Sequence, residues 1–192
     1  MSKGAHQSRG IETVLTIIMF GAGGLLLLLI FALVTGSVGR FAPPVENPAD
    51  FGLGPGKKAP AIVADAWLNG EPVADAKKPM LVQAWFYECP FCWREAPEIV
   101  KLSEQFGDRI DFVALSPDPV STEEQVQEFI DTNQITYPVG YGAQATLNGF
   151  EVRGYPSLWL VGADGTVLWN LASRHEQPLE EAIEAALAAP SI

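Results

Sequence analysis

The two cysteines of the chain stand close together, as Cys89-Pro90-Phe91-Cys92, and they are the only cysteines among its 192 residues. An apolar run, residues 80–87, precedes them, and a longer amphipathic pattern follows. This order predicts a buried strand and then a helix that begins near Pro90, since proline is well tolerated in the first helical turn. Cys89 is therefore expected at the helix N-terminus, where the helix dipole and free backbone amides stabilise a thiolate.

The spacing of the pair favours redox chemistry. Three residues after Cys89, Cys92 returns to the same face of the helix, where its thiol can attack a mixed disulfide formed at Cys89. A purely structural disulfide is the alternative, but so short a loop adds little stability when it is closed. A zinc site would need two further ligands, and the only histidines are His6 in the N-terminal tail and His175. We therefore expect a redox-active disulfide that needs neither a metal nor an organic cofactor.

Hydropathy and turn signals predict the elements around this pair. We expect an α/β fold with a mixed central sheet flanked by helices on both faces. An Asn69-Gly70 pair between apolar residues predicts an N-terminal β-hairpin. The remaining predicted elements, in chain order, are strand 80–87, helix 90–106, strand 110–116, a helix opened by a Ser121-x-x-Glu124 capping box, strands 157–161 and 166–172, and a closing helix carrying Leu179, Ile183 and Leu187.

Residues 13–39 contain no charged side chain, and about 20 apolar residues suffice to cross a bilayer as a helix. We expect a single N-terminal transmembrane anchor here, in preference to a cleaved signal peptide or a buried core helix. The positive charges of Lys3 and Arg9 favour a cytoplasmic tail over residues 1–12. Residues 40–58, rich in proline and glycine, read as a flexible linker.

The globular domain is then expected over residues 59–189, on the outer side of the cell (inner) membrane, in the periplasm or its equivalent. The formal net charge of the whole chain is −11. An acidic surface repels phosphate backbones, so nucleic-acid binding is not expected.

Three stretches together resemble the thioredoxin superfamily, and specifically the membrane-anchored extracytoplasmic thioredoxins of the TlpA/ResA type. They are APAIVADAWLNGEPV as the N-terminal hairpin, LVQAWFYECPFCWREAP as strand, active site and helix, and VRGYPSLWLVGADGTV as the distal segment. The resemblance covers about residues 56–188. It implies a thioredoxin-like fold and a protein thiol–disulfide oxidoreductase.

The resemblance also implies roles for single residues. Pro156 matches a cis-proline that faces the cysteines, so that the backbone of Tyr155 can pair with a substrate peptide. Trp85 matches a tryptophan of the active-site strand, and its plainer interpretation is a core aromatic. Glu95 matches an active-site glutamate that can exchange a proton with the Cys92 thiol. The alternative for Glu95 is a solvated helix residue.

Several positions depart from the family pattern. Gln83 stands where many cytoplasmic thioredoxins have a buried aspartate, and an amide cannot ionise. Glu88 replaces the usual tryptophan before Cys89, and a carboxylate there opposes thiolate formation unless it turns to solvent. The Pro90-Phe91 dipeptide, which tunes the redox potential, also differs from the usual one. With these departures, a disulfide reductase stays the favoured function, and a disulfide-forming oxidant is the alternative.

Two other functions compete. A peroxiredoxin would need a threonine or serine three residues before its reactive cysteine and a proline seven before; for Cys89 these positions hold Phe86 and Val82. A Sco-type copper-delivery protein would combine two cysteines with a histidine such as His175, but that family spaces its cysteines by three residues. A structural membrane protein with an inert cysteine pair is the remaining alternative.

The resemblance further implies partners. Substrates would be extracytoplasmic proteins that contain cysteines, such as apocytochromes during cytochrome c maturation or oxidase-assembly proteins. A membrane thiol-transporting protein would donate electrons, and the N-terminal helix would contact the lipid bilayer.

Overall fold

The computed structural model describes residues 52–72, 77–117 and 121–189. The predicted tail and anchor, residues 1–39, and the linker up to residue 51 lie outside this set. Within the described ranges, none of the helices combines the length and apolarity needed to cross a bilayer. The anchor over residues 13–39 stays a prediction.

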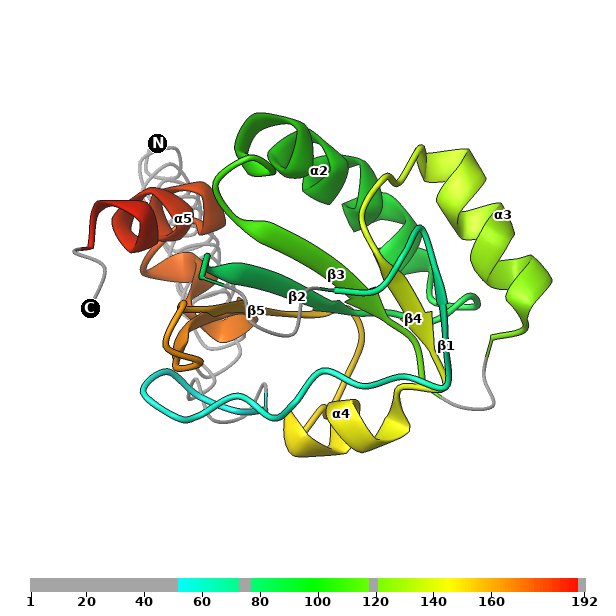
Figure 1. Ribbon diagram of the computed structural model, residues 1–192, viewed down its shortest axis with the longest axis horizontal. Helices are drawn as coiled ribbons and strands as arrows, with labels where there is room; N and C mark the ends of the chain where they lie inside the picture. Colours follow the sequence, from blue (N-terminus) through cyan, green and yellow to red (C-terminus); the bar gives the residue numbers. More distant parts are fainter. Residues whose placement is uncertain (1–51, 73–76, 118–120, 190–192) are drawn as a thin grey trace, which may run out of the picture. The chain divides into compact units, whose positions relative to one another are not determined.

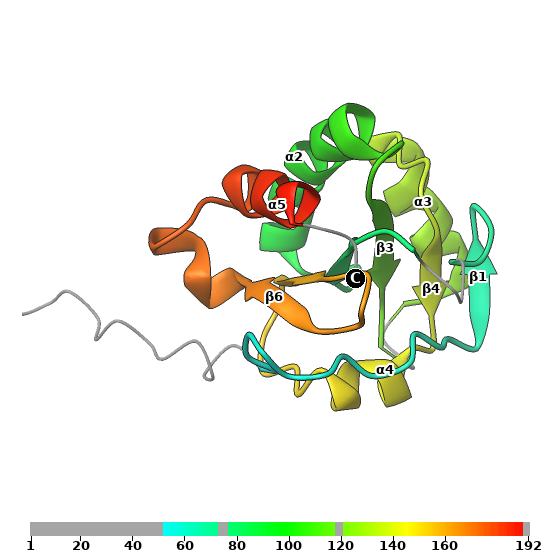
Figure 2. The same ribbon diagram turned by 60° about the vertical axis from the view of Figure 1, so that its left-hand side comes forward.

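Eleven elements follow one another in the described residues. In chain order they are β1 (Ala66–Leu68), β2 (Met80–Ala84), α2 (Pro90–Phe106), β3 (Asp111–Leu115), α3 (Glu123–Asn133), β4 (Val139–Tyr141), α4 (Gln144–Gly149), β5 (Ser157–Val161), β6 (Val167–Asn170), the 3-10 helix η2 (Leu171–His175) and α5 (Leu179–Ala188). The strands form one sheet in the order β1-β4-β3-β2-β5-β6; Figure 1 labels β1 to β5, and Figure 2 labels β6.

The sheet is mixed, as predicted, and β2 lies inside it. β2 runs parallel to β3 and antiparallel to β5, while β5 and β6 form an antiparallel hairpin. Successive side chains of a strand point to opposite faces, so Leu81 joins one core and Val82 the other. Because helices cover both faces of β2, all five of its residues are buried, which explains its nearly continuous apolar sequence.

Two apolar cores fill the space between the sheet and its helices. The larger core packs one face of the sheet against α2, α3 and α5, through residues such as Ile99, Phe129 and Ile183. The smaller core packs the other face against α4, with Leu147 and Phe150. Figure 2 shows α2, α3 and α5 on one side of the sheet and α4 on the other. The first core therefore lies directly beneath the helix that carries the cysteines.

The N-terminal hairpin is not seen in the described residues. β1 pairs antiparallel with β4, which is distant in sequence. Asn69 and Gly70 do have the positive φ angles, 59° and 93°, that a tight turn uses. The strand that would return from this turn falls partly on residues 73–76, outside the described set. The antiparallel partner of β1 comes from tertiary pairing, which a local turn signal does not reveal.

The capping box before α3 begins one residue later than predicted. Thr122, and not Ser121, is the N-cap, and its side chain and that of Gln125 bond to each other's backbone N–H groups. Ser121 is buried, and its hydroxyl accepts a hydrogen bond from Ser116. Ser and Thr are both good N-caps, so the sequence allows a capping box that starts at either Ser121 or Thr122. Because the side chain of Ser121 is buried, Thr122 is the N-cap.

Part of the predicted linker is packed on the domain. The Leu53 N–H donates to the Phe150 carbonyl at 2.8 Å, and the Gly56 N–H donates to the Val167 carbonyl at 2.8 Å. The Lys58 ammonium donates to the Asp164 carbonyl at 2.8 Å. The segment bound to the domain thus begins before residue 59.

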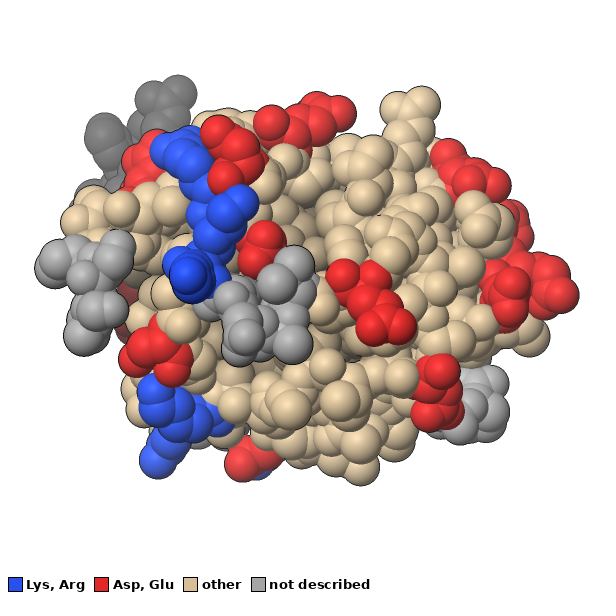
Figure 3. All heavy atoms as spheres, viewed as in Figure 1, with Lys and Arg blue, Asp and Glu red and all other residues tan. Residues whose placement is uncertain are grey.

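The acidic excess appears on the surface of the domain. On the face seen in Figure 3, basic side chains gather towards one end, while acidic side chains are spread over the remainder. This pattern leaves no broad basic surface on that face. That nucleic acid is not a ligand stays a prediction.

Candidate active site

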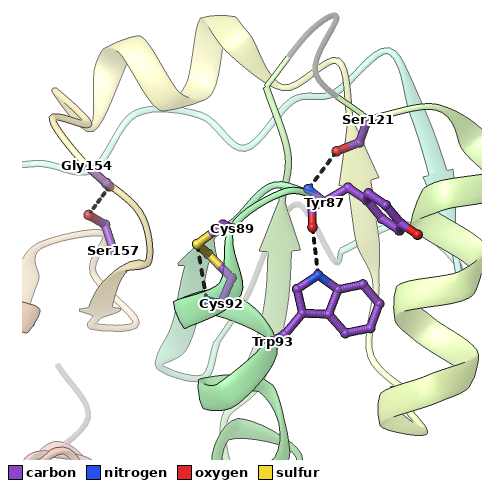
Figure 4. Close-up of a disulfide and its surroundings, with 7 residues drawn as sticks. All are labelled: Tyr87, Cys89, Cys92, Trp93, Ser121, Gly154 and Ser157. Carbon is purple, nitrogen blue, oxygen red and sulfur yellow. Dashed lines mark hydrogen bonds between the residues drawn. A yellow bond between two sulfur atoms is a disulfide. The ribbon is translucent and has the colours of Figure 1, made fainter.

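The two cysteines form a disulfide at the start of α2, with their Cα atoms 5.3 Å apart. Cys89 is the N-cap of the helix, in an extended conformation with φ −86° and ψ 100°, and Pro90 occupies the first turn. The Cys92 N–H donates to the Cys89 sulfur at 3.1 Å, drawn in Figure 4. A cap sulfur receives both this hydrogen bond and the positive end of the helix dipole, so reduction would leave Cys89 the better thiolate of the two.

The cysteines differ in accessibility. Cys92 is fully buried, whereas Cys89 retains 3% exposure. Among the two sulfurs, only that of Cys89 belongs to a residue with surface left for a partner. The predicted order of events, in which Cys89 meets the partner and Cys92 resolves from inside, fits this difference.

The loop that delivers Cys89 is held from two sides. The Trp93 indole N–H donates to the Tyr87 carbonyl at 2.6 Å, and the Tyr87 N–H donates to the Ser121 hydroxyl at 3.2 Å (Figure 4). The Tyr87 and Trp93 rings also meet edge to face, 5.6 Å apart. These contacts join the loop to its own helix and to the segment that leads into α3. The position of Cys89 is therefore fixed by tertiary contacts as well as by its helix.

The Tyr155–Pro156 turn lies across from the disulfide, and Figure 4 shows Gly154 and Ser157 on that opposing segment. The Tyr155–Pro156 peptide bond is cis, as predicted. The Ser157 hydroxyl closes the turn by donating to the Gly154 carbonyl at 2.8 Å. The Tyr155 and Phe86 rings pack edge to face at 5.1 Å, so the turn contacts the loop that carries Cys89. Substrate positioning by Tyr155 and Pro156 stays a prediction.

Glu95 is buried, at 9% exposure, one turn beyond Cys92 on the inner side of α2. Burial raises the pKa of its carboxyl from 4.5 to about 7; Arg174 opposes this rise and Glu98 adds to it. Arg174 and Glu98 themselves pair at 3.7 Å. A carboxyl with this pKa exchanges protons readily near neutral pH.

A pocket of about 490 Å³ opens beside Glu95 between α2, η2, α5 and β5. Arg174 and Glu98 line it together with apolar residues such as Leu158 and Trp169. Glu95 is therefore not a solvated helix residue, and the alternative interpretation of this position is wrong.

Trp85 is fully buried, and its ring stacks on Phe129 of α3 with centroids 3.7 Å apart. Because it presents no surface to a partner, its location fits the core-aromatic interpretation. Any influence on a substrate would pass through its neighbours.

The three residues predicted to tune the redox potential all face solvent. Glu88, Pro90 and Phe91 are exposed, Phe91 to 57%. The Glu88 carboxylate thus turns to solvent, where screening weakens its effect on thiolate formation at Cys89. The Arg94 guanidinium lies 4.5 Å from the centre of the Phe91 ring. Phe91 and Arg94 together form the outer side of the helix start.

Four contributors escaped prediction from the sequence: Phe86, Ser121, Trp93 and Arg174. Trp93 has a local signal, since it is an aromatic residue directly after Cys92 in the motif. Ser121 carried a capping signal that pointed elsewhere. Phe86 and Arg174 act through contacts between segments distant in sequence, for which a single sequence has no signal.

No cluster of three or more potential metal ligands occurs in the described part of the chain. His175 ends η2 and is exposed. Cofactor-free redox chemistry stays a prediction.

Comparison with known proteins gives matches of three kinds. A family model, described as the AhpC/TSA family, matches residues 55–170, a range that includes the cysteine pair and the Tyr155–Pro156 turn. Thioredoxin-like protein YneN of Bacillus subtilis is 28% identical over 122 residues, which are 62% of this chain and 71% of that protein.

The chloroplastic thioredoxin-like protein HCF164 of Oryza sativa subsp. japonica is 32% identical over 94 residues, which are 49% of this chain but only 33% of that protein. Among solved structures, a thiol:disulfide interchange protein from Bacteroides sp. superimposes with a TM-score of 0.54 at 27% identity, covering 62% of this chain and 82% of its own.

Proposed function

Because the chain belongs to the AhpC/TSA family and has a thioredoxin-like fold, we propose that Cys89 and Cys92 exchange thiols for disulfides with partner proteins. One observation carries this proposal: the disulfide between them lies at the N-terminus of α2, opposite the cis Tyr155–Pro156 turn. The names of YneN, a thioredoxin-like protein, and of the Bacteroides thiol:disulfide interchange protein agree with it.

In the reductive direction the chemistry has two steps. The Cys89 thiolate attacks a partner disulfide, so that a Cys89–partner bond forms and the other partner sulfur leaves as a thiolate. The Cys92 thiolate then attacks the Cys89 sulfur, which releases the second partner thiolate and forms the Cys89–Cys92 disulfide. Two electrons pass to the partner. Run in reverse, the same steps oxidise a partner dithiol.

Glu95 is the proposed proton acceptor for Cys92. The Cys92 thiol must lose a proton before it attacks, and it is buried away from bulk water. Glu95 lies on the same inner side of α2, and its raised pKa lets it hold a proton near neutral pH.

A peroxidase is less well supported. Phe86 and Val82 stand where the peroxidatic motif would need a hydroxyl residue and a proline. Phe86 packs on Tyr155 and has no hydroxyl with which to bind a peroxide.

The proposed setting is extracytoplasmic. Residues 13–39 would anchor the chain by a single helix of the TlpA/ResA arrangement, with residues 1–12 in the cytoplasm. Support comes from the uncharged length of this run and from Lys3 and Arg9 before it. Reductase is the proposed direction, with electrons from a membrane thiol-transporting protein and cysteine-containing proteins, such as apocytochromes, as substrates.

Trapping tests the exchange mechanism. In the full membrane-bound chain, Cys92→Ala should accumulate a mixed disulfide between Cys89 and its natural partner, because the resolving thiol is missing. Cys89→Ala is the matched control and should trap nothing. Absence of any mixed disulfide in the Cys92→Ala variant, in cells where the protein is redox-cycled, contradicts the proposal.

Labelling tests the location and the direction. A membrane-impermeant maleimide added to intact cells or spheroplasts should label Cys89 if the domain faces outward and the pair is largely reduced. Labelling only after prior reduction indicates an outward oxidant. Labelling only after the membrane is opened rules out the extracytoplasmic setting.

A further inference from the structure

Gln83 is a buried amide in the middle of β2, with 1% of its surface exposed. Among the described residues, neither its side-chain oxygen nor its nitrogen has a hydrogen-bond partner. An amide buried without partners is costly, and most such groups in folded proteins bind protein atoms or an ordered water. Gln83 therefore needs a partner that the surrounding side chains do not supply.

The register of the sheet fixes where Gln83 lies. Its paired neighbours are Leu158 on β5 and Ala114 on β3. Both belong to the larger core beneath α2, as does Leu81 two positions earlier on the same strand. Side chains two apart on a strand share a face, so the Gln83 amide also faces α2.

Glu95 reaches the same part of this core from above. It lines the pocket together with Leu158, the β5 neighbour of Gln83. Burial raises the pKa of Tyr137, just before β4, and the charge of Glu95 adds to this rise. In the sheet, β2 is bonded to β5 on one side and to β3 on the other, and β4 lies beyond β3, so β2 carries Gln83 between Leu158 and the strand that follows Tyr137.

Glu95 also lacks a partner. Within the described ranges, one buried oxygen of its carboxyl, Oε2, makes no hydrogen bond, and the Tyr137 hydroxyl makes none either. A water molecule could donate to the carboxylate and to the Gln83 oxygen, and accept from the Gln83 nitrogen, which satisfies all three atoms.

We propose that Gln83 and Glu95 hold an internal water molecule beneath α2, and that Gln83 is a positioning residue for proton exchange between Cys92 and Glu95. This inference rests on the proposed function of Glu95. In the resolving step the Cys92 S–H bond breaks and its proton passes through the water to the Glu95 carboxylate. The resulting thiolate forms the bond to Cys89 as the partner thiolate leaves, and that thiolate can take the proton from Glu95.

A neutral amide suits this role because it leaves Glu95 as the acid of the buried site. Gln83 can solvate the carboxylate through the water without adding a second charge. The other titratable or charged groups around Glu95 lie on α2, η2, α5 and before β4, and are Cys92, Glu98, Lys101, Arg174, Glu180 and Tyr137.

The test replaces Gln83→Met, which keeps the side-chain length and removes both polar atoms. Leu81→Met is the matched control, since it places methionine on the same strand and face. Three readouts apply: the Glu95 titration by carboxyl-carbon NMR, a water cross-peak to the Gln83 side-chain amide, and release of thionitrobenzoate from a mixed disulfide made on Cys89.

In wild-type and Leu81→Met protein we expect the Glu95 carboxyl to titrate near neutral pH, with the water cross-peak present. Gln83→Met should titrate at higher pH, because the carboxylate loses solvation, and should release thionitrobenzoate about tenfold more slowly at neutral pH. Gln83→Asn, which keeps the amide, should recover part of the rate. If Gln83→Met merely stabilises the fold and leaves titration and release as in the control, the amide is an unpaired core group and the inference is wrong.

The Glu95→Gln variant distinguishes the role of Glu95 from that of Gln83. If this variant releases thionitrobenzoate at the wild-type rate, the proposed role of Glu95 fails, and the relay fails with it. If Glu95→Gln is slow while Gln83→Met is not, only the role of Gln83 is overturned.

Discussion

At the scale of single residues, Glu95 links the stability of the domain to pH. Its pKa is raised from 4.5 to about 7 by burial, so the folded state binds this proton more tightly than the unfolded state does. Stability from this group is complete below about pH 4.5 and is lost as pH rises through about 7. The whole effect is about 3 kcal/mol, since one pKa unit corresponds to about 1.4 kcal/mol.

We therefore expect Glu95→Gln to flatten the fall in unfolding free energy between about pH 4.5 and pH 8. Urea unfolding of the oxidised domain at several pH values measures this. Glu104→Gln, which changes an exposed glutamate of the same helix, should keep the wild-type pH dependence. An equally steep fall in Glu95→Gln would mean that other groups cause it.

Substitutions of Trp85 distinguish a role in core packing from a role in thiol–disulfide exchange. Its ring stacks on Phe129 in a fully buried position, so Trp85→Ala should lower the free energy of unfolding by about 3–5 kcal/mol. The rate of exchange per folded molecule should change little, which insulin reduction normalised to the folded fraction measures. A large loss of rate in a fully folded Trp85→Phe variant would instead favour the substrate-positioning role.

At the scale of elements, the start of α3 offers a paired test. Thr122 caps the helix, whereas Ser121 accepts the hydrogen bond from the Tyr87 N–H in the active-site loop. Thr122→Ala should cost about 1 kcal/mol of unfolding free energy and leave the redox equilibrium with glutathione unchanged. Ser121→Ala should alter that equilibrium, because it frees the loop that positions Cys89. Identical redox equilibria in both variants would show that this loop contact does not matter.

The sequence predicts elements where a local pattern is strong. The long helix α2, the buried strands β2 and β3 and the hairpin of β5 and β6 all appear near the expected residues. The sequence patterns do not predict β4 and α4, which have only three and six residues. α4 has no side-chain cap, and so short a helix forms only through packing. Its buried residues Thr146 and Leu147 supply that packing.

The same division holds for the candidate site. Cys89, Cys92 and Pro156 are recognisable because their chemistry is rare and their spacing is fixed. Glu95 was identified by position, but its burial depends on how η2 and α5 fold back over α2. The Ser121–Tyr87 contact joins residues 34 apart, and no local pattern encodes such a distance.

At the scale of the whole molecule, the segment before residue 59 is part of the domain. The buried Trp159 donates its indole N–H to the Leu53 carbonyl at 3.0 Å. A fragment of residues 59–192 loses this acceptor, and an unpaired buried donor costs about 1–3 kcal/mol. It should therefore unfold at lower urea concentration than a fragment of residues 52–192. Equal midpoints would mean that the segment adds no stability.

The segment before residue 59 also covers part of an edge of the sheet, which bears on association between molecules of this protein. β6 ends the sheet, and its outer backbone groups would be open to strands of other molecules. The Val167 N–H donates to the Lys57 carbonyl, the Gly56 N–H donates to the Val167 carbonyl, and Lys58 bridges to Thr166. These bonds pair the start of β6 with the chain's own backbone, and the Lys58 ammonium lies beside it. We expect this pairing to hinder the association of β6 with strand edges of other molecules.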